Sequence, residues 1–256
     1  KALPFISAKK GTGPSYTIEP FEPHRLEQVK AIYESFSPLY FGPAIRTPDY
    51  WEGQLNWLKE KPGEFQVALE DQQVVAYLRV KEGRDLCLEI TEACYNPGHE
   101  SACLALVEDV LMKKPGVKHL KAALPKSHAL TSFFIEGGAE RREESYAMWK
   151  IVDLSALFTK LKKVFFKRLQ ASSMERDVGI SSPLLIQSGD QEVLLHLRHD
   201  SVEVLEPEEH LTYQGFYKRK PAELLSDLIN GSPIEEPIIK TLFPNREAAF
   251  WRTDTF

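Results

Sequence analysis

Three strand-like runs stand close together in the first half of the chain, and they constrain its fold more than any other feature. Residues 65–69 and 74–80 are separated by Glu70-Asp71-Gln72-Gln73, a connection of hairpin length, and residues 86–94 follow as a third run. Apolar runs of this length bounded by turn residues predict strands. We therefore expect a three-stranded antiparallel meander at the centre of a folded domain.

Helical patterns surround this meander. Residues 16–21 predict a short strand, and Pro23 opens a helix whose apolar residues keep helical spacing as far as Phe36. The double glycine Gly137-Gly138 is the expected end of a later helix. The remaining predicted elements are helices at 49–59, 100–113 and 130–136 and strands at 119–123 and 146–152.

A second group of elements begins at Asp153, which is available to cap the start of a long helix. Gly189-Asp190-Gln191 predicts a hairpin turn, and Asn230-Gly231-Ser232-Pro233 holds both a C-cap glycine and a helix-starting proline. The predicted strands are 184–188, 192–199, 201–205 and 211–216, and the predicted helices are 221–229 and 234–242. These elements together predict an α+β layer.

The long helix after Asp153 is basic, and two interpretations of it are open. Its lysines at positions 160, 162, 163 and 167 fall mostly between the apolar residues Leu161, Phe165 and Leu169. A basic amphipathic helix can lie on a membrane surface. We favour a helix that packs its apolar face on a core and leaves the lysines in solvent.

Length and composition bound the organisation. The 256 residues exceed the usual size of one domain, so we expect two compact units. We assign residues 1–15 to a linker, 16–152 to a mixed α/β domain and 153–256 to an α+β domain. Residues 1–15 hold no Met and no signal-like apolar stretch, which predicts an internal start with a further segment before it.

Charge, cysteines and histidines exclude several function classes. The formal net charge of -5 argues against a nucleic-acid binder, and no apolar run approaches the ~20 residues of a membrane span. Cys87, Cys94 and Cys103 lack a CxxC spacing, which predicts free thiols in a reducing compartment. His196 and His199 fall on opposite faces of a predicted strand, so we expect no metal site. A cytoplasmic protein is the resulting expectation.

The order of elements over residues 16–154 resembles the GNAT N-acyltransferase fold. The most specific local match is residues 127–139, where a helix and a double glycine precede the strand with Met148-Trp149-Lys150. Together with Leu224 to Gly231 and the tail Leu242-Phe243-Pro244 to Phe256, the whole resembles acetyltransferases of the enhanced intracellular survival family. In that family two GNAT-like units precede a sterol-carrier-protein-like domain, and only the first unit binds acetyl-CoA.

The resemblance implies that this chain corresponds to the second, degenerate GNAT-like unit and the carrier-like domain. Acyl transfer needs a cradle of backbone N–H groups for the coenzyme A pyrophosphate at a strand-to-helix junction. When Gly98 is aligned with the first motif glycine, Tyr95 replaces Arg or Gln, Glu100 replaces a small residue and Pro97 removes an N–H. The tyrosine acid and the asparagine of the family fall on two residues of other types, Phe134 and Ser127. We therefore expect the fold without its cofactor, acetyl-CoA being bound elsewhere in a longer protein.

The resemblance also assigns a catalytic role to Phe256. The family ends inside the active site of the first unit, where the free terminal carboxylate is the general base toward the amine. An α-carboxyl group has a reference pKa of about 3.5 and is ionised at neutral pH. The alternative is an apolar terminus packed for stability, with Phe250, Trp251 and Phe256 as anchors.

Three functions stay open at this point. The first is a part of a GNAT-type N-acetyltransferase, with an N-terminal GNAT domain of the same protein and an amine substrate as partners. The second is a lipid- or sterol-binding module, and the third is a structural unit of a homo-oligomer. Residues able to line an apolar tunnel, or equally to fill a solid core, are Leu185, Val193, Leu195, Val204, Phe216, Leu225 and Ile229.

Overall fold

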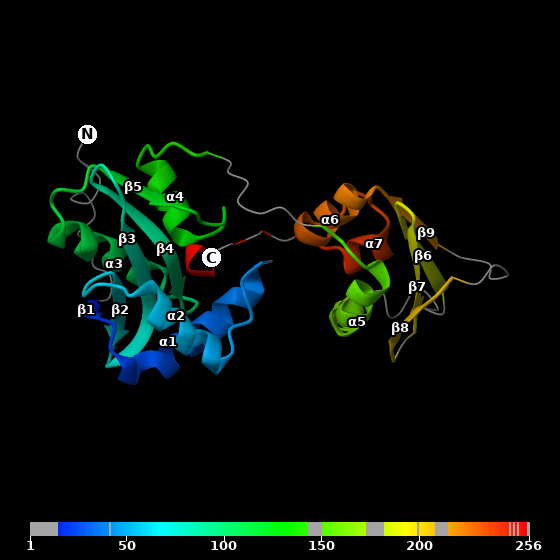
Figure 1. The fold of residues 1–256 in the computed structure, drawn as a ribbon, viewed down its shortest axis with the longest axis horizontal. Helices are drawn as coiled ribbons and strands as arrows, with labels where there is room; N and C mark the ends of the chain where they lie inside the picture. The colour runs from blue at the N-terminus through cyan, green and yellow to red at the C-terminus, as the bar shows by residue number, and fades with distance from the viewer. Residues whose placement is uncertain are drawn as a thin grey trace. The chain divides into compact units, whose positions relative to one another are not determined.

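The structure is a computed structural model that describes residues 15–40, 42–142, 150–172, 182–198, 200–207, 215–245, 247, 249 and 251–254. It divides into two compact units (Figure 1). Unit 1 comprises Lys1–Arg142 and Glu247–Phe256, and unit 2 comprises Glu143–Arg246. Both units combine helices with mostly antiparallel sheets, so the α+β class is confirmed.

Unit 1 is built on a five-stranded sheet with the order β1-β2-β3-β4-β5. Neighbours are antiparallel except for β4 and β5, which are parallel. The elements are β1 (Thr17–Pro20), α1 (Leu26–Phe36), α2 (Pro48–Leu58), β2 (Phe65–Glu70), β3 (Gln73–Glu82), β4 (Cys87–Tyr95), α3 (Glu100–Lys113), β5 (His119–Ala122) and α4 (Ala129–Glu136), with short 3-10 turns at Pro23–Arg25, Ser37–Leu39 and Arg252–Asp254.

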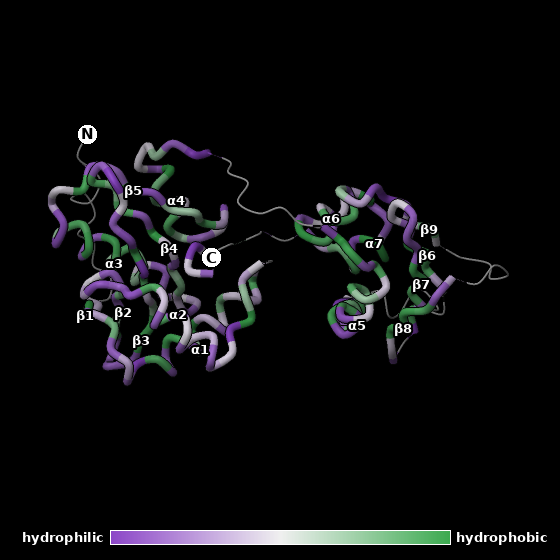
Figure 2. Tube along the Cα trace, in the orientation of Figure 1, coloured by the Kyte–Doolittle hydropathy of each residue, from purple (hydrophilic) through white to green (hydrophobic). Residues whose placement is uncertain are grey.

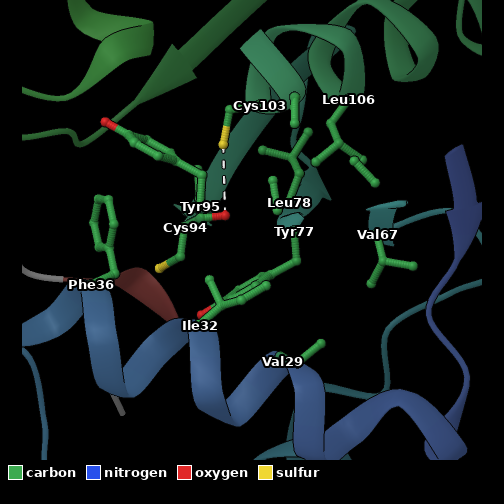
Figure 3. Packing of buried hydrophobic residues seen from close by; sticks show 14 of the residues in the cluster. Val29, Ile32, Phe36, Val67, Tyr77, Leu78, Cys94, Tyr95, Cys103 and Leu106 are labelled. Carbon is green, nitrogen blue, oxygen red and sulfur yellow. Dashed lines mark hydrogen bonds between the residues drawn. The ribbon is translucent and has the colours of Figure 1, made fainter. Parts of the chain in front are cut away.

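The core of unit 1 lies on both faces of this sheet. Figure 3 shows Val29, Ile32 and Phe36 of α1 directed at one face, and Cys103 and Leu106 of α3 at the other. All five of these side chains are buried. Strand residues alternate between the two faces, so every second position of β3 and β4 faces α1. This alternation places polar residues of β3 and β4 on the same side as α1 and α2.

β4 and β5 pair over a short stretch only. Cys87 to Ile90 of β4 are matched with His119 to Ala122 of β5, while β4 continues to Tyr95. Beyond the paired stretch, the carbonyl of Ala93 accepts a hydrogen bond from His128 Nε2 at 3.1 Å. The His128 side chain therefore supplies a hydrogen bond to β4 beyond the stretch that pairs with β5.

Unit 2 is a four-stranded sheet with the order β8-β7-β6-β9, in which β9 is parallel to β6. Figure 2 shows green, hydrophobic stretches along its strands, and the long helix α5 packs on the sheet through Phe158 and Phe165. The elements are α5 (Leu154–Ala171), β6 (Ser182–Ser188), β7 (Gln191–Leu197), β8 (Val202–Leu205), β9 (Gly215–Arg219), α6 (Pro221–Asn230) and α7 (Pro237–Leu242). The lysines of α5 are exposed, as the core-facing interpretation predicts.

Several predicted boundaries differ from the structure. The domain break falls between Arg142 and Glu143 rather than after residue 152, and residues from Glu247 onward return to unit 1. The last helix begins at Pro237, not at residue 234, because proline fits only the first turn of a helix. The predicted strand 146–152 lies mostly outside the described residues, and its end, residues 150–152, is not a strand.

Candidate functional site

The last described segment of the chain, residues 251–254, docks on unit 1 (Figure 1, red). Its 3-10 turn, Arg252–Asp254, packs against β4, and Trp251 and Thr253 are buried. The residues to which it is hydrogen-bonded lie 161 to 221 positions earlier in the chain. The contact is built from charged and polar groups that are themselves buried, and it is the candidate functional site.

Arg46 is the centre of this site. Its side chain is fully buried and lies against the faces of two rings, 3.9 Å from the centroid of Tyr33 and 4.5 Å from that of Trp51. Its Nη1 and Nη2 each donate to a carboxylate oxygen of Glu92 at 2.8 Å, a bidentate pair. Its Nε donates to Asp254 Oδ1 at 2.9 Å. One guanidinium therefore joins a carboxylate of the sheet to a carboxylate of the docked segment.

Glu92 of β4 has no exposed surface and receives several donors. Beside Arg46, the hydroxyls of Tyr77 and Thr253 donate to its two oxygens. Burial alone would raise the pKa of Glu92, but the charge and hydrogen bonds of Arg46, followed by the charge of Arg79 and the Thr253 hydroxyl, lower it to about 2. Glu92 is therefore ionised throughout the physiological range.

A second buried arginine, Arg79 of β3, contributes to the same site. Arg79 forms a bidentate pair with Glu60, Nε and Nη2 standing 2.7 and 2.8 Å from the carboxylate oxygens. Its Nη1 donates to Gln54 Oε1 at 2.6 Å. The amide nitrogen of Gln54 in turn donates to the Thr253 carbonyl at 2.9 Å. The orientation of Gln54 toward the segment is thus fixed by Arg79.

Three donors converge on one oxygen of Asp254. They are Arg46 Nε at 2.9 Å, Tyr50 Oη at 3.2 Å and Gln54 Nε2 at 3.2 Å. Burial, followed by the charge of Asp254, raises the pKa of Tyr50, so its hydroxyl stays protonated and donates. Asp254 retains only 12% of its side-chain exposure. Unit 1 therefore holds this carboxylate as a specific acceptor.

Trp251 fills the apolar end of the site. Its ring lies 6.2 Å from that of Phe36 and 6.4 Å from that of His128, and only 1% of the residue is exposed. His128 is itself buried: its Nδ1 accepts from the Leu130 N–H, which caps α4. Burial is the main cause that lowers the pKa of His128 to about 4, so the ring is neutral. The tryptophan therefore packs on an uncharged surface.

The predicted cofactor junction between β4 and α3 has a different geometry from a phosphate cradle. Gly98 has φ of +87°, and its N–H donates to the Glu100 carboxylate at 3.1 Å. The nearby His99 pairs with Glu70 at 3.0 Å. The negatively charged Glu100 carboxylate thus already accepts the N–H of Gly98. Pro97 has no backbone N–H to donate. In this structure the Glu100 carboxylate therefore lies where an anion would have to meet the Gly98 N–H.

The other two aligned positions also have local partners. Ser127 donates through its hydroxyl to Glu247, and its N–H donates to the same carboxylate at 2.8 Å. The Tyr40 hydroxyl lies 3.4 Å from Ser127 Oγ. Phe134 packs on the core of unit 1. Ser127 is therefore joined to the same returning segment of the chain, through Glu247.

The other predictions concern Phe256, a metal site and a membrane span. Phe256 lies outside the described residues. Over the described part of the chain, no group of three or more His, Cys, Asp or Glu is placed to hold a metal ion, and the three cysteines are free. No helix among the residues shown is long and apolar enough to cross a membrane.

Sequence reasoning missed the buried network. A signal was present, because Arg79 and Glu92 stand inside runs predicted to be buried strands, and a buried charge requires a partner. Nothing in the sequence pairs them with Arg46, which precedes a helix, or with Asp254 near the end of the chain. The partners are set by tertiary structure alone.

Over its described residues, unit 1 has a strand, two helices, a three-stranded meander, a helix, a strand and a helix, which is the predicted order as far as the helix that precedes residues 146–152. No protein-family model matches the sequence, and no curated protein matches it. Several solved acetyltransferase structures do resemble it.

A diaminobutyrate acetyltransferase from Paenibacillus lautus, solved with L-2,4-diaminobutyric acid and coenzyme A, matches with a TM-score of 0.39 at 11% identity, over 48% of this chain and 75% of its own. A GNAT family acetyltransferase from Streptococcus pneumoniae matches with 0.39 at 17% identity, over 54% and 100%. A ribosomal-protein-alanine N-acetyltransferase from Brucella melitensis matches with 0.40 at 11% identity, over 54% and 100%. TM-scores below 0.5 at such identities carry no inference about chemistry.

Proposed function

We propose that this chain is the non-catalytic part of a GNAT-type, acetyl-CoA-dependent N-acetyltransferase. In this proposal unit 1 is a degenerate acyltransferase unit that serves as scaffold, and a catalytic GNAT domain of the same protein binds acetyl-CoA. Unit 2 is the carrier-like domain. The amine substrate meets the catalytic domain, and the protein assembles as a homo-oligomer in the cytoplasm.

One observation carries this proposal: the Glu100 carboxylate accepts the N–H of Gly98 at the junction where the GNAT fold would cradle a pyrophosphate. A bound pyrophosphate would have to displace that carboxylate and then stand beside its negative charge. Phe134 has no hydroxyl with which to protonate a leaving thiolate. In this proposal unit 1 therefore has the acyltransferase order of elements but lacks a free N–H at Gly98 for the pyrophosphate and a hydroxyl acid for the thiolate.

Calorimetric titration of the 256-residue chain with acetyl-CoA tests the proposal. We expect no saturable heat at micromolar ligand. The matched variant is Gly98→Trp, whose side chain would enter the open space beside this glycine; it should be less stable because φ is +87° there, and it should likewise give no saturable heat. Saturable binding that Gly98→Trp abolishes would show a working cofactor site in unit 1 and would overturn the proposal.

The catalytic role of Phe256 belongs to the same proposal. Support comes from the position of Asp254, two residues earlier, which unit 1 holds through three donors. A general base has to stay within reach of the proton that it removes. In the longer enzyme, a few residues added after Phe256 should lower kcat/KM for the amine by roughly 10²–10⁴-fold at an unchanged Tm. Equal rates would leave Phe256 as a hydrophobic anchor only.

The lipid-carrier alternative receives no support from unit 2. Its core contains a packed group of rings, with Tyr217 stacked on Phe243 at 5.3 Å and Phe165 at 5.9 Å from Phe243. The proposed lining residues also divide between the two faces of the sheet. Val193 and Leu195 lie in the core, whereas Phe216 is 56% exposed and Leu185 shares its face. Native mass spectrometry should accordingly show no lipid adduct, and reproducible co-purification of a fatty acid or sterol would contradict this expectation.

A further inference from the structure

The docked segment meets unit 1 through all four of its side chains. Arg252 pairs with Glu89 of β4 at 3.1 Å, and the other three make three different kinds of contact. Trp251 enters an apolar site beside Phe36. The Thr253 hydroxyl accepts from Arg46 Nη2 at 3.0 Å and donates to Glu92. Asp254 receives donors from α2 and from Arg46. A buried aromatic ring, a hydroxyl that both accepts and donates, and a carboxylate bound by several donors are features of specific recognition rather than of general packing.

The receiving groups of unit 1 are held in place without the segment. Arg46 is fixed by the bidentate pair with Glu92 and by the two flanking rings. Gln54 is fixed by Arg79 and His128 by the Ala93 carbonyl. None of these contacts involves residues 251–254. Arg46, Gln54 and His128 therefore keep these partners when the segment is absent, which is the condition for preorganised binding, whereas the hydroxyl of Tyr50 donates to the segment itself.

The balance of buried charges in unit 1 also indicates that the site can exist without the segment. Without Asp254, the two buried arginines, Arg46 and Arg79, are matched by two carboxylates, Glu92 and Glu60. Asp254 adds one negative charge to a buried set that is already balanced, while Arg252 of the same segment pairs with Glu89 outside that set. The Asp254 carboxylate is bound through directed hydrogen bonds, so its departure leaves no unpaired buried ion, whereas removal of a partner from a buried pair does.

We propose that unit 1 carries a binding site for a peptide segment of the pattern Trp-x-Thr-Asp, and that this site is separable from the folding of unit 1. Residues 251–254 of the chain itself fill the site in this structure. The site accepts the same segment in trans when its own copy is absent. Covalent attachment gives the chain's own segment a high effective concentration, so a free ligand competes only after that segment is released.

A cleavable form of the full chain tests the proposal. A protease recognition sequence placed at Arg246, between unit 2 and the returning segment, allows the segment to be cut and washed away. A fluorescein-labelled synthetic peptide of residues 247–256 is then titrated and followed by anisotropy. We expect one peptide to bind per chain, with a Kd on the order of micromolar. The uncleaved chain should not bind it, because its own segment occupies the site.

Variants of the peptide and of unit 1 define the recognition. Asp254→Asn in the peptide should weaken binding about tenfold or more, since the acceptor of the hydrogen bond from Arg46 Nε then carries no charge. A scrambled peptide should not bind. In unit 1, Tyr50→Phe removes one donor to Asp254 and should weaken binding several-fold, whereas Tyr16→Phe, whose hydroxyl contacts Ser101, should not change it.

Several results would overturn the proposal. One is a cleaved chain whose tryptophan fluorescence reports an unfolded unit 1 that added peptide does not restore. Equal binding of the unchanged, Asp254→Asn and scrambled peptides is another. A third is equal binding by the cleaved and uncleaved chains. Where cleavage unfolds unit 1 and the peptide refolds it at a one-to-one ratio, the binding site is supported, and its pre-formed character is rejected.

Discussion

At the scale of single residues, His128 makes unit 1 sensitive to acid. Its pKa is lowered from 6.5 to about 4 in the folded protein, chiefly by burial. Between these two pH values the unfolded chain binds a proton at His128 and the folded chain does not. The free energy of unfolding should therefore fall by about 3 kcal/mol as pH falls through that window.

His128→Asn checks this, because asparagine can still cap α4 at Leu130 but does not titrate. Urea unfolding of unit 1, followed through its three tryptophans Trp51, Trp57 and Trp251, should lose the pH dependence between about 4 and 6.5. His24, an exposed residue, provides the control His24→Asn, which should keep it. An unchanged pH slope in His128→Asn would show that other groups cause the sensitivity.

The pair of Arg46 and Glu92 leads to a second prediction at this scale. Glu92→Gln leaves two buried arginines short of one carboxylate and should cost about 3–5 kcal/mol in unit 1. Arg46→Met should cost a similar amount, and the double variant much less than the sum, because the ion left behind is then removed too. Glu89→Gln on the same strand breaks a half-buried pair with Arg252 and should cost less than Glu92→Gln, about 1 kcal/mol. Additive costs for Arg46 and Glu92 would contradict the coupling.

At the scale of elements, two glycines with nearly the same backbone conformation differ in their surroundings. Gly231 after α6 and Gly63 before β2 have φ of +87° and +86°. A Cβ at Gly231 would lie 2.7 Å from the Pro244 carbonyl carbon and nearer still to the backbone of Asn245, whereas at Gly63 nothing lies within 4 Å. We expect Gly63→Ala to cost about 1 kcal/mol through strain alone.

Gly231→Ala should cost several times more, because the chain leaving α7 has to move as well. Thermal unfolding of each variant gives the comparison. Similar losses of stability at the two positions would mean that residues 244–245 move aside freely and that the close approach at Gly231 does not affect stability.

Local patterns predicted most elements, and the reason is visible in the turns. The meander, α3 and the Gly189 hairpin follow from short-range signals, since Gly189 adopts φ of +65° and Ser188 pairs with Gln191. The helix start at Pro237 was missed because the prediction assigned the start to Pro233, although a helix that begins there would place Pro237 beyond its first turn. The returning tail was missed because it depends on contacts with residues about 200 positions away, such as Arg46 with Asp254. No local pattern encodes such a pairing.

At the scale of the whole molecule, each unit closes its own core. The buried cluster of unit 1 takes its members from residues 29–130 and from Ala249 and Trp251, and that of unit 2 from residues 154–243. Replacing residues 143–246 by a flexible linker of about 20 residues, which reaches ~60 Å when extended, should therefore leave unit 1 folded.

The measurement is the tryptophan fluorescence and urea midpoint of the shortened chain against the full chain. A second shortened chain that also lacks residues 247–256 is the matched control, and it should be less stable because Trp251 no longer covers Phe36 and His128. Two shortened chains of equal stability would show that the returning segment contributes nothing to unit 1.

The return of residues 247–254 to unit 1 also reverses the order in which the protein is completed during synthesis. The ribosome delivers the sheet of unit 1 first, then all of unit 2, and only afterwards the segment with Trp251 and Asp254. Unit 2 has every residue of its buried cluster while unit 1 still lacks two of its own. The unit that starts first along the chain is therefore the one that matures last, after unit 2 has had the chance to fold.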